Sequence, residues 1–271
     1  MNRDRPLFDP PGPRARRRIR TLNAVSGAGI AIVLGVTLWA FAARGQLAPD
    51  RWSFLTDGAM LQFLGVGLVN TLACASAAAL LSFPLGVALA LCRHSRHMWL
   101  ARPAALWIEV FRSVPLLLVI LVALTLGPSL GFNPSLFWKL VLAIVLCVSP
   151  VVAEVVRAGM RAVPRGQIEA ATALGLRPAA VKRLLIVPQA LRMMAPALLS
   201  QLVAIVKDST LGYAVGFPEL LKQSQTLSAF TGHLIQVTLV VSVMFVLLNL
   251  ALSRIAGRVA QRARSTAHAA P

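Results

Sequence analysis

Six long stretches without a charged side chain constrain the fold of this chain more than any other feature. A helix needs about 20 mostly apolar residues to cross the hydrocarbon core of a bilayer. Only 13% of the 271 residues are charged and 57% are hydrophobic, a balance that does not suit a soluble domain. The sequence therefore predicts an all-α, polytopic membrane protein with six transmembrane helices. The charge-free stretches are residues 21–43, 58–92, 113–138, 140–153, 193–206 and 223–253.

The positions of the predicted spans follow from these stretches. The fourth stretch reaches spanning length only by including Glu154 and Arg157, and the fifth only by including Lys207 and Asp208. The first is long enough to span and lacks a small-residue cleavage site, so we expect a retained helix rather than a secretory signal. We expect the spans at 22–43, 61–92, 104–127, 136–157, 193–217 and 233–253.

The predicted spans divide the chain into four parts. A basic tail at 1–20 combines Pro-Pro-Gly-Pro with an Arg cluster, so we expect it to be mobile and attracted to anionic lipid. An extra N-terminal helix and an outer loop follow at 21–60. The transmembrane domain covers 61–256, with a polar connection at 158–192 between the fourth and fifth spans. A second tail occupies 257–271.

The net charge of +18 is spread unevenly over the connections. Lys and Arg crowd both termini, the segment after the second span and the 158–192 segment, whereas the connections at 44–57, 127–136 and 218–232 carry little or no excess of positive charge. This alternation follows the positive-inside rule and predicts that both termini and the 158–192 segment are cytoplasmic. Because basic clusters beside spans are explained by the membrane, we expect no nucleic-acid partner. The three cysteines lie in or beside different apolar stretches and predict neither a disulfide nor a metal site.

The 158–192 segment is predicted to form a helix, a turn and a second helix. Residues 167–174 are strong helix formers, Gly175 is expected to end this helix, and Pro178 can start the next one, which Pro188 should break. Small side chains dominate one face of the first helix. A helix that rests on lipid usually carries bulky apolar residues, so the small face favours close contact with another protein, although a lipid-resting helix remains the alternative. The residues on this face are Ile168, Ala171, Thr172 and Gly175.

Within this segment, EAATALG at 169–175 is followed by nine residues and then by LIVP at 185–188. This pattern is similar to the EAA signature of binding-protein-dependent ABC importer permeases, which is Glu-Ala-Ala, three residues, Gly, nine residues and Ile-x-Leu-Pro. Further stretches resemble the polar amino-acid subfamily of these permeases, over about residues 65 to 255. They are NTL at 70–72, FRSVPLLL at 111–118, AEVVRAG at 153–159 and VKDSTLG at 206–212. The N-terminal LFDPPGP and the extra first span look like actinobacterial glutamate permease subunits.

The resemblance implies a type I ABC importer permease fold with a cytoplasmic coupling helix in a bacterial plasma membrane. It implies an amino-acid importer, for glutamate or a related polar amino acid. The implied partners are cytoplasmic ABC ATPase subunits, an extracellular amino-acid-binding protein and a second permease subunit, either identical or related. ATP and Mg²⁺ would bind to the ATPase and no cofactor to this chain, which has no GxxxxGK[ST] sequence. The residues implied in ATPase coupling are Gly166, Gln167, Glu169, Ala170, Ala171 and Gly175.

Charged residues inside predicted spans are a second set of candidate functional residues. Each raises the free energy of membrane insertion by about 2.5–3.5 kcal/mol near the bilayer centre, so its presence indicates a function. Glu154 and Arg157 lie three residues apart on one helix face, where either local pairing or a role in gating is expected. Lys207 and Asp208 are adjacent and cannot share a helix face, so they should contact different partners or lie in unwound backbone. A Lys facing the pore would favour an anionic solute, and ion pairing between helices is the alternative. The candidate pore residues are Glu154, Arg157, Lys207, Asp208, Ser209 and Thr210.

Two other classes of membrane protein fit the sequence less well. A membrane enzyme would need clustered acids or histidines, whereas the nine acids and four histidines of this chain are scattered. An ion-coupled secondary transporter of small polar solutes is the alternative function. It would need intramembrane acids and usually internal repeats, and neither is evident in the sequence.

Overall fold

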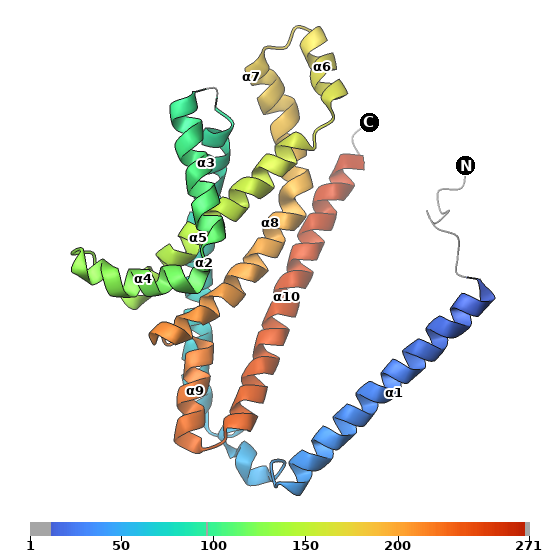
Figure 1. Ribbon diagram of the computed structural model, residues 1–271, viewed down its shortest axis with the longest axis vertical. Helices are drawn as coiled ribbons and strands as arrows, with labels where there is room; N and C mark the ends of the chain where they lie inside the picture. Colours follow the sequence, from blue (N-terminus) through green and yellow to red (C-terminus); the bar gives the residue numbers. More distant parts are fainter. Residues whose placement is uncertain (1–11, 96, 269–271) are drawn as a thin grey trace. The chain divides into compact units, whose positions relative to one another are not determined.

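The computed structural model describes residues 12–95 and 97–268, with side chains as far as residue 258. Every regular element in this part of the chain is helical, which confirms the all-α prediction. The chain forms two units, Met1–Thr56 and Asp57–Pro271. Among the described residues, five helices are long and apolar enough to cross a membrane, or six when one bent pair is taken as a single span. Figure 1 shows the second unit with α6 and α7 at one end of its long helices and α9 at the other.

The first unit contains α1 (Pro13–Ala43) and the short 3₁₀ helix η1 (Pro49–Leu55). None of the residues of α1 is buried. Pro13 occupies the start of the helix, where its missing N–H costs nothing. The helix thus already begins at Pro13 and includes residues 13–20 of the predicted basic tail. Residues 1–11 lie outside the described part of the chain.

The core of the second unit lies between α2 (Gly58–Arg93) and α5 (Leu136–Arg161). On α5, buried residues recur at every fourth position: Leu140, Ile144, Val148, Val152 and Val156. On α2, a row of small residues with the same spacing is buried: Ala78, Ser82, Gly86 and Ala90. Such small residues allow two helix backbones to approach closely within a membrane. At Gly86 a Cβ atom would lie 2.6 Å from the Val152 side chain and 2.7 Å from the carbonyl oxygen of Ser149.

The third predicted span is not one straight helix. It is divided into α3 (Met98–Ser113) and α4 (Leu116–Ser129), which meet at an angle of 101°. Val114 is extended and Pro115 follows it, as expected for a residue whose helical conformation is disfavoured by the next proline ring. Figure 1 shows α4 turning away from the long axes of α2 and α3.

The fifth span is longer than expected. The short α7 (Pro178–Val181), the π-helical turn η2 (Lys182–Ile186), α8 (Val187–Ser209) and the 3₁₀ turn η3 (Thr210–Val215) follow one another without a break. The expected break at Pro188 is therefore wrong. Pro188 is the second residue of α8, and the wider π turn directly before it lets the helix continue past the missing N–H of the proline. Of the two alternatives for Lys207 and Asp208, the structure excludes unwound backbone, since both lie within α8.

The connection before the last span contains a further helix, α9 (Leu220–Thr231), which is followed by α10 (Leu234–His268). Glu219 caps α9, and its carboxylate accepts hydrogen bonds from the backbone N–H groups of Leu221 at 2.8 Å and Lys222 at 2.6 Å. Asn70 and Thr71 of α2 bind the residues at the start of α9. Asn70 Nδ2 donates to the carbonyl oxygen of Pro218, and Thr71 Oγ1 accepts a hydrogen bond from the N–H of Leu220. The NTL sequence at 70–72 thus fixes the start of α9 against α2.

Glu219 is fully buried, and this burial raises the pKa of its carboxyl group to about 7. The two backbone hydrogen bonds lower the pKa and so oppose this effect. The cap of α9 is therefore a group that titrates close to neutral pH.

Candidate functional site

The first candidate site is α6 (Arg165–Ala173), a nine-residue helix that follows α5. Gly175 has a left-handed backbone with φ of +80° and ends the helix as predicted. The N–H of Leu176 donates to the carbonyl oxygen of Ala171 at 3.2 Å, and the N–H of Gly175 donates to that of Thr172 at 2.9 Å. These two bonds form a Schellman motif, in which a residue with a Cβ would be strained at position 175.

The two faces of α6 differ in exposure. Ala171 is only 7% exposed and is turned toward the rest of its own chain, with Ile168 half-buried on the same side. The opposite face is open and carries Gly166, Glu169 and Ala170, whereas Gln167 is exposed but lies on the side of Ala171, four residues before it. A Cβ at Gly166 would meet nothing within 4 Å, so the packing of this chain does not explain the glycine. The small face inferred from the sequence is thus partly buried against the rest of the chain. The surface of α6 that stays exposed is the adjoining face.

A hydrogen bond connects α6 to α8, the long helix that follows it in the chain. Gln189 Nε2 on α8 donates to Gln167 Oε1 on α6 at 2.7 Å. Val163, just before α6, and Val181, at the end of α7, are both buried. In the chain, α6 lies between α5 and α8, two of the membrane-spanning helices.

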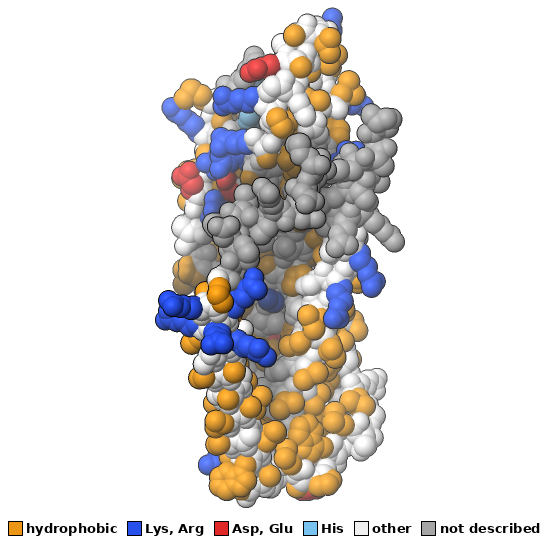
Figure 2. All heavy atoms as spheres, turned by 90° about the vertical axis from the view of Figure 1, so that its right-hand side faces the viewer, with side chains coloured by type: hydrophobic (Ala, Val, Ile, Leu, Met, Phe, Trp, Pro, Cys, Tyr) orange, Lys and Arg blue, Asp and Glu red, His pale blue; other side chains and the backbone are white. Residues whose placement is uncertain are grey.

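The surroundings of α6 are strongly basic. In the 158–192 segment six residues are Lys or Arg, and Glu169 is the single acid. Figure 2 shows one face of the molecule, on which blue Lys and Arg side chains form clusters and red Asp and Glu side chains are few.

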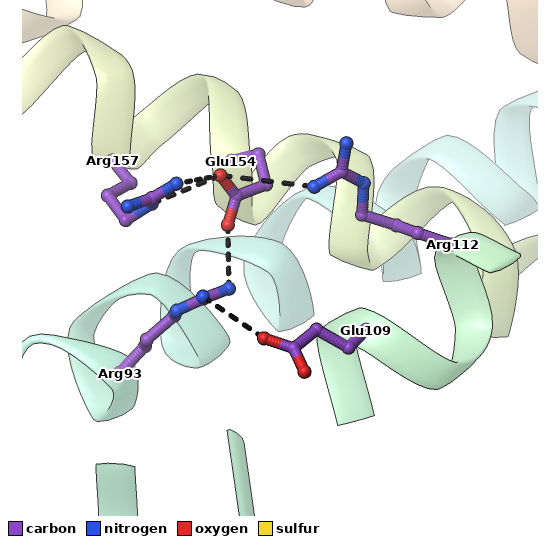
Figure 3. Close-up of polar contacts among 5 residues, drawn as sticks. All are labelled: Arg93, Glu109, Arg112, Glu154 and Arg157. Carbon is purple, nitrogen blue, oxygen red and sulfur yellow. Dashed lines mark hydrogen bonds and ion pairs between the residues drawn. The ribbon is translucent and has the colours of Figure 1, made fainter. Parts of the chain in front are cut away.

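A cluster of five charged residues forms the second candidate site (Figure 3). At its centre, Glu154 on α5 accepts a hydrogen bond from Arg93 Nη1, at the end of α2, at 2.8 Å. Glu154 also accepts from Arg157 Nε at 3.1 Å, and a guanidinium nitrogen of Arg112 on α3 lies 4.0 Å away. Arg93 additionally pairs with Glu109 of α3 at 3.5 Å. The expected pairing of Glu154 with Arg157 is therefore part of a network that joins α2, α3 and α5.

The third candidate site is a cleft of about 440 Å³ between α8 and α10. Four polar side chains line it, Lys207 and Thr210 from the α8–η3 junction and Asn249 and Ser253 from α10. Its apolar wall is formed by Val203, Phe245, Val246 and Leu250. Within the described part of the chain Lys207 forms no ion pair, so a free ammonium group lies at an apolar cleft in a membrane span.

The structure brings together only some of the candidate pore residues. Lys207 and Thr210 share the cleft, whereas the Ser209 hydroxyl is buried and donates to the carbonyl oxygen of Val206 at 2.8 Å. Asp208 is not among the residues that line the cleft, and Glu154 and Arg157 belong to the separate charge cluster. Asn249 and Ser253 are not identified from the sequence, because they are uncharged residues within an apolar stretch. Among the described residues no group of acids, histidines and cysteines could hold a metal ion.

Comparisons with known proteins agree with this arrangement. Residues 82–265 match the family described as binding-protein-dependent transport system inner membrane component. The chain is 31% identical over 226 residues to the glutamate transport system permease protein GluD of Corynebacterium glutamicum, spanning 82% of this chain and 83% of that protein. It is 30% identical over 205 residues to the probable glutamine ABC transporter permease protein GlnP of Bacillus subtilis, spanning 74% of this chain and 94% of that protein.

A solved structure described as an amino acid ABC transporter with histidines aligns with a TM-score of 0.74 and 29% identity, covering 77% of this chain and 98% of that chain. The inward-facing MetNI methionine ABC transporter shares the fold, with a TM-score of 0.64 and 24% identity over 76% of this chain and 99% of that chain. The long helices around α5, the α6 connection and the family match lead to the same conclusion: the chain belongs to the binding-protein-dependent transport system inner membrane components, the transmembrane permeases of ABC importers.

Proposed function

We propose that this chain is a permease subunit of an ATP-driven importer of polar amino acids, glutamate or a close relative of it, in a bacterial plasma membrane. Relatives named for glutamate, glutamine and glutamate/aspartate transport support this solute class. The asymmetric distribution of Lys and Arg supports an orientation with both termini and the 158–192 segment in the cytoplasm.

The observation that carries the coupling mechanism is the open face of α6. This helix is capped at its end and presents Gly166, Glu169 and Ala170 to the outside of the chain, with the exposed Gln167 at the edge of this face. We propose that a separate cytoplasmic ATPase binds this face, with ATP and Mg²⁺ on the ATPase and Ala171 and Gly175 shaping the helix from within. When the ATPases close, α6 would move as a rigid body and carry α5 and α8 with it.

The solute path is proposed to pass the α8–α10 cleft. The cleft is open in this single chain, and a second permease subunit, identical or related, would close it into a pore. Lys207 then supplies a positive charge for a solute carboxylate, and Thr210, Asn249 and Ser253 supply hydrogen-bonding groups. An extracellular amino-acid-binding protein would deliver the solute from the opposite side of the membrane.

The proposal is tested by reconstituting the permease with its ATPase and binding protein in proteoliposomes. Uptake of radiolabelled glutamate, competed with a panel of amino acids, should require ATP and the binding protein. Glu169→Lys should insert into the membrane normally and lose uptake, because it reverses the charge on the docking face. Arg177→Gln, a change outside that face, is the matched control. Normal uptake by Glu169→Lys, or uptake driven by an ion gradient without ATP, contradicts the proposal.

A further inference from the structure

A cavity of about 210 Å³ lies where four segments of the second unit meet. Its walls come from the end of α2, the end of α5, the inner face of α6 and the η2–α8 junction. Apolar side chains form most of its lining: Leu91, Met160, Ile168, Ile186 and Val187. Basic groups line the same cavity: His94, Arg157, Arg161 and Lys182.

The cavity lies at the level where two spans leave the apolar part of the bilayer. Leu91 precedes the last residue of α2 by two positions, and Met160 is the penultimate residue of α5. A lipid acyl chain can therefore reach the apolar walls from the bilayer, and the basic side chains stand at the depth of the lipid headgroups. This placement holds whichever side of the membrane the cavity faces.

The positive charges at the cavity are incompletely compensated within the chain. In the part of the chain that the structure describes, Arg161 and Lys182 form no ion pair. Arg157 shares Glu154 with Arg93 and Arg112, and Glu109 pairs with Arg93, so two carboxylates face three guanidinium groups. Glu169, the acid next to Ile168 in the chain, is exposed and makes no ion pair among the described residues.

We propose that this cavity binds an anionic phospholipid, with an acyl chain against the apolar walls and the phosphate between Arg161 and Lys182. The combination of apolar and basic side chains in the lining favours an anionic phospholipid over other occupants. A free phosphate would leave the apolar walls bare, and a zwitterionic lipid would bring its own cation to a site that already has an excess of positive charge. Basic pockets between transmembrane helices are a general route to anionic lipid recognition.

A bound lipid would also support α6. Ile168 is the α6 residue that lines the cavity, and the other walls belong to two spans and the start of α8. The occupant would thus fill the space behind the helix whose outer face we propose as the ATPase docking surface. Lipid binding itself does not depend on that proposed function, whereas an effect of the lipid on ATP-driven uptake does.

The experiment is native mass spectrometry of the purified full chain released from vesicles of phosphatidylglycerol and phosphatidylcholine with identical acyl chains. The wild type should retain phosphatidylglycerol preferentially. The double variant Arg161→Gln, Lys182→Gln should reduce that retention about 25-fold, because each basic group at a membrane surface contributes about a five-fold preference. The double variant Arg177→Gln, Arg183→Gln is the matched control, since it removes two exposed charges from the same segment outside the cavity.

A second variant tests the apolar half of the site. Ile168→Trp fills the cavity and leaves every charge in place, so it too should lose phosphatidylglycerol while eluting as a folded protein in size-exclusion chromatography. Inorganic phosphate, added alone, should neither compete with the lipid nor raise the melting temperature. Equal losses in the cavity and control double variants overturn the proposal, as does full retention by Ile168→Trp or competition by phosphate. Lipid loss with unchanged uptake removes the effect on transport and leaves both the binding site and the importer function standing.

Discussion

The carboxylate of Glu154 should contribute more to the stability of the helix packing than any other acid in the charge cluster. Its side chain is 18% exposed and contacts the guanidinium groups of Arg93, at 2.8 Å, and Arg157. Glu154→Gln keeps the size of the side chain and leaves these cations without their shared anion. Exposed ion pairs contribute about 0–1 kcal/mol, and breaking a fully buried pair costs about 3–5 kcal/mol. Because the burial of Glu154 is intermediate, we expect a loss of about 2 kcal/mol in the free energy of unfolding.

Glu109 provides a matched control on the same arginine. It pairs with Arg93 at 3.5 Å, but its side chain is 69% exposed. Solvent screening should limit the cost of Glu109→Gln to about 0.3 kcal/mol. The assay is thermal unfolding of the purified proteins in a mild detergent, where 1 kcal/mol corresponds to about 2–4 °C for a chain of this size. The melting temperature should fall by about 4–8 °C for Glu154→Gln and by about 1 °C for Glu109→Gln.

A double-mutant cycle separates pairing from general charge effects. Combining Arg93→Gln with Glu154→Gln should cost less than the sum of the single changes, by about 1 kcal/mol, because the two residues interact directly. Arg93→Gln combined with Glu109→Gln should deviate from additivity by only about 0.3 kcal/mol, because solvent screens the exposed Arg93–Glu109 pair. Equal losses from the two acids, or additivity in the Arg93–Glu154 cycle, would refute the central position of Glu154 in the network.

Three further predictions follow from individual contacts. Gly86→Val should lower the free energy of unfolding by about 2 kcal/mol, because the added Cβ would lie 2.6 Å from the Val152 side chain. Gly65→Val on the same helix is the control, since its Cβ would enter open space, and it should change the free energy of unfolding by less than about 0.5 kcal/mol. Equal effects of the two variants in thermal unfolding would contradict close packing at Gly86. The pKa of Glu219 is raised to about 7, so its contribution to stability is full below its ordinary pKa of 4.5 and is lost as pH rises through 7. The melting temperature of the wild type should therefore fall between pH 5 and pH 8 more than that of Glu219→Gln, and identical slopes would show that Glu219 does not titrate there. Lys207→Gln should weaken uptake of acidic amino acids relative to neutral ones in competition assays, and unchanged selectivity would exclude Lys207 from the solute path.

The positions of the spans could be predicted because membrane insertion depends chiefly on length and apolar composition. The 104–127 stretch shows the limit of that information. Val114 and Pro115 lie inside an uninterrupted apolar sequence, so composition indicates one span, although the proline ring directs the preceding residue out of the helix and the chain bends there. Pro188 misleads in the opposite direction, because the π turn before it lets the helix continue where a break is expected.

The candidate sites were predictable where local sequence determines local structure. The helix of residues 165–173 and its end at Gly175 follow from helix propensity and from the left-handed glycine. Contacts between distant segments were not predictable. Arg93 meets Glu154 across 61 positions of the sequence, and Asn70 reaches Pro218 across 148. Asn249 joins Lys207 in one cleft for the same reason, since only the packing of α8 against α10 brings them together.

Site-directed disulfide formation between the permease and its ATPase tests the docking role of α6 most directly. In a variant whose three native cysteines are replaced, Glu169→Cys should form a disulfide with a cysteine in the ATPase cleft, and ATP should change the rate of its formation. Phe230→Cys, which is 79% exposed on α9, is the control and should form none. Cross-linking is expected from α6 alone, together with loss of uptake once the disulfide forms. Cross-linking from Phe230→Cys but not from Glu169→Cys would contradict the docking role of α6.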